Sequence, residues 1–87
     1  MITLYSKPHC TFCEKAKHWL IKNGIAFEAI DISSDESARE FIMAEGHKTV
    51  PQIYLNGKIL VEGGYTGLSK HEPEQLKEMI DAAAKSL

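Results

Sequence analysis

The sequence predicts an α/β fold in which helices flank a mixed four-stranded sheet. Two observations predict it. Apolar residues alternate with other residues in some stretches, as in strands, and recur every third or fourth position in others, as in helices. Glycine and proline turn signals separate these stretches. The resulting order is β-α-β-α-β-β-α, and a chain of 87 residues has room for a single domain, 1–87.

A strand, a helix and a second strand are predicted at the start of the chain. Residues 2–5 alternate between apolar and less apolar side chains, which indicates a strand. A helix is predicted over residues 11–23, with charged side chains on one face and Gly24 as its stop. Its apolar face contains Phe12, Ala16, Trp19 and Leu20. Residues 25–32 give the next strand, and a strand–helix–strand order favours a parallel pair.

The second helix is predicted from a capping pattern. Ser33 and Glu36 stand three residues apart, as in a capping box, and this places the start of a helix that ends near Glu45. Its predicted core residues are Ala38, Phe41 and Ile42.

A hairpin and a last helix complete the predicted order. Asn56-Gly57, between residues 52–55 and 58–61, is a strong signal for a two-residue hairpin turn. A short turn is expected over residues 66–70. The last helix then begins near Pro73, which suits a first helical position.

Composition narrows the class of protein. The formal net charge is -2 at pH 7, which argues against a nucleic-acid partner. No apolar stretch approaches the roughly 18 residues that span a bilayer. The N-terminus lacks the basic and apolar regions of a signal peptide. We therefore expect a cytoplasmic monomer that binds neither nucleic acid nor membrane.

The two cysteines, Cys10 and Cys13, are the candidate reactive groups. A disulfide that closes so short a loop stabilises little. The pair follows a strand and a turn and opens a helix, where free N–H groups and the helix dipole favour a thiolate on Cys10. Lys7 adds positive charge nearby. Cys10 is therefore the predicted nucleophile, and Cys13, one helical turn along, is predicted to resolve a mixed disulfide.

Other uses of the cysteine pair stay open at this point: half of a zinc site, a structural bridge, or two inert core thiols. A structural zinc site needs four ligands. His9 directly precedes Cys10, and His18 falls on the polar helix face, so neither is well placed to complete a tetrahedron. The β-α-β context favours redox chemistry.

Thr49-Val50-Pro51 is a second candidate motif, directly before a predicted strand. A cis Val50–Pro51 bond would turn the backbone of Val50 outward beside the cysteines. Its N–H and C=O could then pair with a substrate backbone as a strand does. An ordinary trans proline at a strand entrance is the alternative.

Gly63-Gly64-Tyr65-Thr66 is a third candidate motif. Its glycines permit a close backbone approach or a positive φ. The turn that follows exposes N–H groups that can bind a carboxylate. A plain turn from strand to helix is the alternative.

Together the three motifs resemble the glutaredoxin family, and the resemblance covers nearly the whole chain. Residues 5–13 are similar to that family's active-site stretch, residues 49–54 to its cis-proline stretch, and residues 63–66 to its glutathione-binding turn. The resemblance implies a thioredoxin-like fold and glutathione-dependent reduction of protein disulfides and glutathione mixed disulfides through Cys10 and Cys13. It implies glutathione as the reducing co-substrate and no tightly bound cofactor.

The resemblance also implies a glutathione site. Val50 would pair with the cysteinyl backbone, and Tyr65 and Thr66 would bind the γ-glutamyl carboxylate. Lys7 and Gln52 would reach toward the glycyl carboxylate. The full predicted set is Lys7, Thr11, Phe12, Thr49, Val50, Pro51, Gln52, Gly64, Tyr65 and Thr66.

Three positions depart from the family pattern: Thr11 replaces the usual proline, Phe12 the usual tyrosine, and Gly67 a common acidic residue. Two alternatives therefore stay open. One is a redoxin that thioredoxin reductase reduces and that donates electrons to ribonucleotide reductase. The other is a [2Fe–2S]- or zinc-binding module. The expected partners are glutathione and disulfide-containing or glutathionylated proteins, with ribonucleotide reductase as a further candidate.

Overall fold

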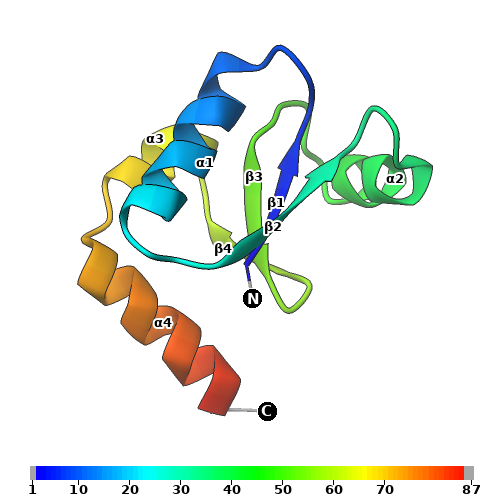
Figure 1. Ribbon diagram of the computed structural model, residues 1–87. Coiled ribbons are helices and arrows are strands. Elements are labelled where there is room, and N and C mark those ends of the chain that lie inside the picture. The colour runs from blue at the N-terminus through cyan, green and yellow to red at the C-terminus, as the bar shows by residue number, and fades with distance from the viewer. Residues whose placement is uncertain (1, 86–87) are drawn as a thin grey trace.

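A four-stranded sheet forms the middle layer of the structure, a computed structural model in which residues 2–85 are described (Figure 1). Its strands are β1 (Ile2–Ser6), β2 (Phe27–Asp31), β3 (Gln52–Leu55) and β4 (Lys58–Val61). Their spatial order is β2-β1-β3-β4, with β2 parallel to β1 and the other neighbours antiparallel. The helices are α1 (Thr11–Lys22), α2 (Glu36–Ala44), α3 (Gly64–Ser69) and α4 (Pro73–Lys85). The mixed sheet and its parallel first pair confirm the prediction.

The two faces of the sheet are covered differently. Helices α1 and α3 lie on one face and α2 lies on the other (Figure 1). Because side chains alternate along a strand, β1 sends Leu4 into the core under α1 and Tyr5 toward α2. The Tyr5 ring centroid lies 5.7 Å from that of Phe41 on α2. The buried core under α1 consists of Ile2, Leu4, Ala16, Leu20, Ile25, Ile53, Leu55, Val61, Leu68 and Leu76.

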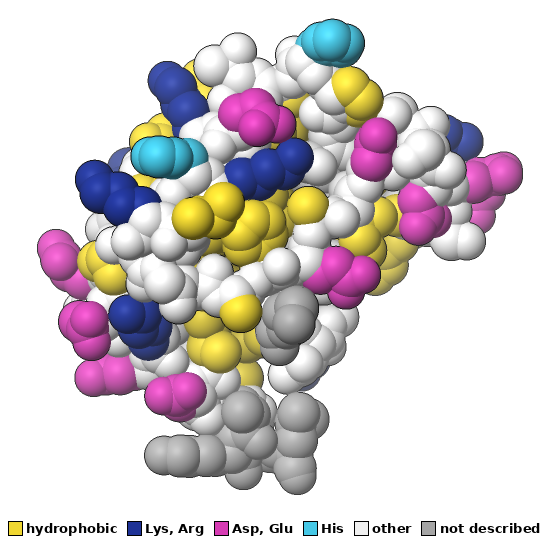
Figure 2. Space-filling view, viewed as in Figure 1, with side chains coloured by type: hydrophobic (Ala, Val, Ile, Leu, Met, Phe, Trp, Pro, Cys, Tyr) yellow, Lys and Arg dark blue, Asp and Glu magenta, His cyan; other side chains and the backbone are white. Residues whose placement is uncertain are grey.

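Charged side chains are spread unevenly over the surface. On the face shown in Figure 2, basic side chains gather over α1, and acidic ones gather over α4 and around α2. Lys17 and Glu14 form an exposed ion pair at 3.3 Å, and such pairs contribute at most about 1 kcal/mol. No helix in the described part of the chain is long and apolar enough to cross a membrane.

A helix stands where the sequence predicted a short turn after β4. The chain leaves β4 through Gly63 and Gly64, both at positive φ (87° and 58°), and enters α3 at once. Because glycine adopts these angles freely, the reversal needs no connecting loop. The element order is therefore β-α-β-α-β-β-α-α, with one helix more than predicted.

The start of α2 also differs from the prediction. Asp35 is the N-cap, and its side chain accepts a hydrogen bond from the Ala38 N–H at 3.0 Å. The N–H and hydroxyl of Ser33 instead donate to the Asp31 carboxylate at 2.8 and 2.6 Å, and these bonds lower the Asp31 pKa. The prediction of a capping box at Ser33 is therefore wrong, because the N-cap of α2 lies two residues later, at Asp35.

Candidate active site

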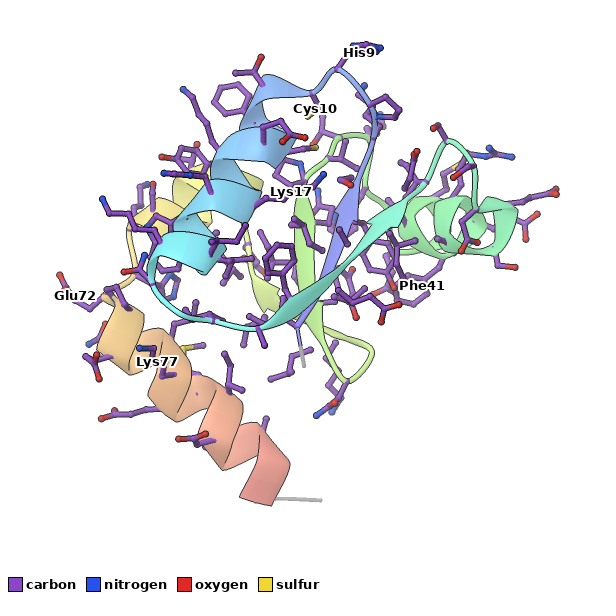
Figure 3. All side chains as sticks on the ribbon, viewed as in Figure 1. His9, Cys10, Lys17, Phe41, Glu72 and Lys77 are labelled. Atoms are coloured by element: carbon purple, nitrogen blue, oxygen red, sulfur yellow. The ribbon has the colours of Figure 1, made fainter. Side chains whose placement is uncertain are left out.

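Cys10 lies at the N-cap of α1, where the loop from β1 meets the helix (Figure 3). Its Sγ accepts a hydrogen bond from the Cys13 N–H at 3.3 Å. That N–H is one of the helix-terminal donors with no partner inside the helix. Donation to the sulfur stabilises negative charge there. The structure therefore places Cys10, half-buried, as the accessible sulfur of the pair.

Cys13 differs sharply from Cys10. It lies in the first turn of α1 with no exposed surface. Burial, followed by a side-chain hydrogen bond with Cys10, raises the pKa of the Cys13 thiol to about 11. At neutral pH Cys13 is thus a protonated thiol, and the two sulfurs are chemically unequal.

The Val50–Pro51 peptide bond is cis, as the sequence predicted. The Cys10 thiol donates to the Val50 carbonyl at 3.8 Å, across 40 residues of sequence. Within residues 2–85 the Val50 N–H has no hydrogen-bond acceptor. Gln52 is buried, and its Nε2 donates to the Thr49 carbonyl at 2.8 Å. The side chain of Gln52 thus fixes the segment that contacts Cys10.

The first hollow is a cavity of about 360 Å³ beside this segment. It contains no charged side chain, and it is lined by Phe12, Thr49, Val50, Pro51, Gln52, Gly63, Gly64, Tyr65 and Thr66. A Cβ at Gly64 would stand 2.8 Å from the Pro51 carbonyl oxygen, and Gly64 also has a positive φ. Only glycine allows α3 to approach the cis-proline segment this closely. The second and third motifs therefore form one cavity wall.

Gly67 has a structural role that the sequence did not reveal. A Cβ at this position would collide with the carbonyl oxygen of Glu62 at the end of β4. The missing side chain lets the first turns of α3 pack directly on β4. Gly67 is thus a packing requirement of this chain, and an acidic residue there would need the backbone to move.

Phe12, which the sequence placed on the apolar face of the helix and also among the predicted glutathione-site residues, is exposed, with 54% of its surface accessible. At the first turn of α1 that face lies beyond the sheet, so Phe12 forms a wall of the first hollow. Its ring lies 6.3 Å from that of Tyr65, and Lys15 Nζ lies 5.3 Å and 5.9 Å from the two ring centroids. Thr11 is exposed beside it and lines a separate surface depression with Lys15 and Tyr65.

A second hollow, of about 320 Å³, adjoins the first at Thr49 and Val50. Four of its residues carry a cationic or imidazole side chain, and its lining consists of Lys7, Ile32, Arg39, Ile42, Met43, His47, Lys48, Thr49 and Val50. Lys7 belongs to this hollow and Gln52 to the first, so the two residues expected at one carboxylate line different cavities. Arg39 and Met43 were not predicted for the site. Their spacing on α2 was visible in the sequence, but the approach of α2 to Lys7 was not.

A hydrogen-bonded group lies behind the second hollow. The Tyr54 hydroxyl donates to Glu45 Oε1 at 3.1 Å, and His47 Nε2 lies 2.7 Å from the Tyr54 hydroxyl oxygen. Because the hydroxyl proton goes to Glu45, His47 must donate through Nε2. Burial and then the bond to Glu45 raise the pKa of Tyr54 to about 12.

The described residues provide no ready set of metal ligands. Across residues 2–85, no three His, Cys, Asp or Glu side chains come together. His9 points away from Cys10 at the outer edge of the loop (Figure 3).

A four-stranded mixed sheet, a Cys-x-x-Cys pair opening a helix and a cis-proline segment against the first sulfur define a thioredoxin-like fold with a thiol–disulfide exchange centre. The glutaredoxin family model matches residues 2–60. The chain belongs to the glutaredoxin family, whose members are thiol–disulfide oxidoreductases.

Individual relatives agree with this assignment. The chain is 37% identical over 70 residues to hybrid peroxiredoxin hyPrx5 of Haemophilus influenzae, covering 80% of this chain and 28% of the relative. It is 38% identical over 61 residues to glutaredoxin-C6 of Oryza sativa, covering 66% of this chain and 54% of the relative. The solution structure of a Brucella melitensis glutaredoxin superposes with a TM-score of 0.71 at 31% identity, covering 91% and 86% of the two chains. The chain thus spans about a quarter and about half of these two curated relatives.

Proposed function

We propose that this chain reduces protein disulfides and glutathione mixed disulfides, with glutathione as the reducing co-substrate. One observation carries the proposal: the half-buried Cys10 Sγ accepts a helix N-terminal N–H while it contacts the Val50 carbonyl at the edge of the first hollow. A disulfide that reaches this sulfur therefore lies beside free backbone groups able to hold a peptide. The family assignment supports the same chemistry.

The inequality of the two thiols sets the order of steps. The Cys10 thiolate attacks one sulfur of the substrate disulfide, and the other sulfur leaves as a thiolate that takes up a proton. Cys13, a thiol until then because its pKa is about 11, loses its proton and attacks the Cys10 sulfur. This step releases the second substrate thiol and leaves a Cys10–Cys13 disulfide. With a glutathione mixed disulfide, a second glutathione thiolate can instead attack the glutathione sulfur bound to Cys10, which forms oxidised glutathione and releases the Cys10 thiolate.

The hollows suggest how glutathione binds. The free Val50 N–H and the Val50 C=O would pair with its cysteinyl backbone in the manner of a strand. The γ-glutamyl end would occupy the first hollow against Tyr65 and Thr66. The glycyl carboxylate would lie toward Lys7. Gln52 would act by holding the Thr49 carbonyl, since its amide is already engaged there.

Two serine variants test the order of steps. Cys10→Ser should abolish turnover of every disulfide, because the attacking sulfur is gone. Cys13→Ser should keep activity on a glutathionylated peptide within about threefold of wild type and lose activity on an intramolecular protein disulfide. A coupled assay with glutathione, glutathione reductase and NADPH measures both. Equal losses from the two substitutions on the glutathionylated peptide would contradict the proposed monothiol step.

A second candidate is the same chemistry with a flavoprotein reductase as electron source. The observation that favours it is that the first hollow has no charged side chain. A side chain at Gly67, the residue after the lining residue Thr66, would collide with the Glu62 carbonyl. Oxidised protein should be offered glutathione and, in parallel, thioredoxin reductase with NADPH. Faster reduction by glutathione supports the main proposal. Faster reduction by thioredoxin reductase would make the reductase, and not glutathione, the electron donor, and the roles of Cys10 and Cys13 would stay the same.

A further inference from the structure

The second hollow brings together several cationic side chains that form no ion pair among the described residues. Lys7, Arg39 and Lys48 line it, and no lining residue is acidic. Within residues 2–85 none of these three side chains forms an ion pair or hydrogen bond. The chain as a whole has a net charge of -2, so the cluster does not follow from overall composition. Charge of one sign in a concave site attracts ligands of the opposite sign.

The same hollow has an apolar side. Ile32, Ile42 and Met43 line it next to the cations, and Met43 is 67% exposed. An unbranched thioether at the rim adapts to side chains of different shape. A cation cluster beside an exposed apolar surface fits a polypeptide segment that carries both acidic and apolar residues better than it fits a small inorganic anion.

The position of the hollow connects it with the reactive sulfur. Thr49 and Val50 line both hollows, and the Val50 carbonyl contacts Cys10 Sγ. A peptide whose disulfide reaches Cys10 and whose backbone passes along Val50 would place flanking residues in the second hollow. Glutathione bound with its γ-glutamyl end in the first hollow has only its glycyl carboxylate left for three cations.

We propose that the second hollow docks an acidic, partly apolar segment that flanks the reactive disulfide of a protein substrate. The proposal rests on disulfide exchange at Cys10 as described above. Arg39 and Lys48 contact the acidic side chains, Ile32 and Met43 contact the apolar one, and the hollow selects among protein disulfides by the charge of their flanks.

The test is a single turnover without glutathione. Protein reduced in advance and freed of reductant is mixed with one of three peptides that contain the same internal disulfide, flanked by Glu-Leu-Glu, Gln-Leu-Gln or Lys-Leu-Lys. Acid quenching and thiol alkylation give the second-order rate constant for formation of the Cys10–Cys13 disulfide. We expect the Glu peptide to react about tenfold faster than the Lys peptide at low salt, with the gap shrinking at high salt.

Two double variants with the same charge change locate the effect. Arg39→Gln with Lys48→Gln should reduce the Glu-over-Lys preference to below about threefold. Lys22→Gln with Lys58→Gln, in exposed positions at the end of α1 and on β4, should retain it. Far-UV circular dichroism checks that both variants fold.

Each other outcome overturns the proposal in a distinct way. Equal rates for the three peptides exclude selection by charge. If both double variants lose the preference for the Glu peptide to the same extent, the preference comes from the overall charge of the protein and not from a docking site. A preference that survives Arg39→Gln with Lys48→Gln, together with a raised KM for glutathione, assigns the hollow to the glycyl carboxylate. Reduction of none of the peptides contradicts disulfide exchange itself, whereas failure of glutathione as reductant leaves the experiment unaffected.

Discussion

The two hollows, which share Thr49 and Val50, differ in the chemical groups that line them. The first is walled largely by backbone: a cis-proline segment, a glycine turn and the start of α3, with no charged side chain. The second is walled by side chains from α2 and from the loops around it, and most of its polar groups are cationic. The first can recognise a peptide backbone of any sequence, and the second can recognise only charge and shape. In the proposed function, general chemistry and selection among substrates thus belong to two hollows that share Thr49 and Val50.

This difference predicts how each hollow tolerates substitution. The first hollow depends on a close backbone contact at Gly64, and the α3 helix beside it depends on another at Gly67, and neither has room to adjust. Side chains of the second hollow, such as Arg39 and Lys48, are exposed and can change without moving the chain. Substitutions should therefore act through structure in the first and through charge in the second.

The largest effect should come from Gly67→Asp, the substitution that restores the family's common acidic residue. Because a Cβ there collides with the Glu62 carbonyl, α3 must move away from β4 and the first hollow must deform. We expect a loss of about 3 kcal/mol in the free energy of unfolding and lower activity with glutathionylated peptide. Urea unfolding and the coupled assay measure the two. Thr66→Asp, on an exposed neighbour, is the matched control for the stability measurement only, because Thr66 lines the first hollow. Unchanged stability with higher activity in Gly67→Asp would show that the backbone relaxes easily.

The Cys10 sulfur contacts Val50, which lines both hollows, and the difference between the Cys10 and Cys13 thiols gives a pH test. The raised pKa of Cys13 means that the unfolded thiol, near 9.0, loses its proton before the folded one, near 11. Stability from this group is therefore complete below pH 9 and is lost as pH rises toward 11. The expected loss is roughly 2 kcal/mol for the reduced protein.

Urea unfolding between pH 8 and pH 11 under reducing conditions measures this slope. Cys13→Ser should flatten it, since serine does not titrate in this range. Cys10→Ser removes the neighbouring thiol and serves as the matched comparison. An equal slope in wild type and Cys13→Ser would show that Cys13 ionises in the folded state as easily as in the unfolded one.

The sequence predicted most of what depends on near neighbours. Cys10, Cys13 and the cis Val50–Pro51 bond belong to short motifs whose geometry is local, and the sheet followed from alternation and from Asn56-Gly57. The α3 helix was missed because six residues after two glycines carry too little periodicity to distinguish a helix from a turn.

The content of the hollows was less predictable, because it depends on how distant elements pack. Arg39 lines the same hollow as Lys7 only because α2 packs on the face of the sheet opposite α1. Gln52 looked like a ligand residue, and in the structure its amide is engaged by Thr49. Gly67 looked like a missing carboxylate, and the structure shows a contact with Glu62 that no spacing rule contains.

The smallest of the expected effects concerns the support of the second hollow. Tyr54→Phe removes the hydroxyl that joins Glu45 and His47, and it leaves the ring contacts with Tyr5 and Phe41 in place. We expect a loss of about 1 kcal/mol in the free energy of unfolding at pH 7. Since the Tyr54 pKa is raised to about 12, wild type should also lose stability as pH rises from 10 toward 12, and the variant should lack this part of the slope.

Because His47 lines only the second hollow, the Tyr54→Phe variant should lower the single-turnover rate with the Glu-flanked peptide more than the rate with glutathionylated peptide. Equal effects on both substrates would mean that the two hollows are mechanically coupled through Val50, and the separation of backbone recognition from charge recognition would then fail.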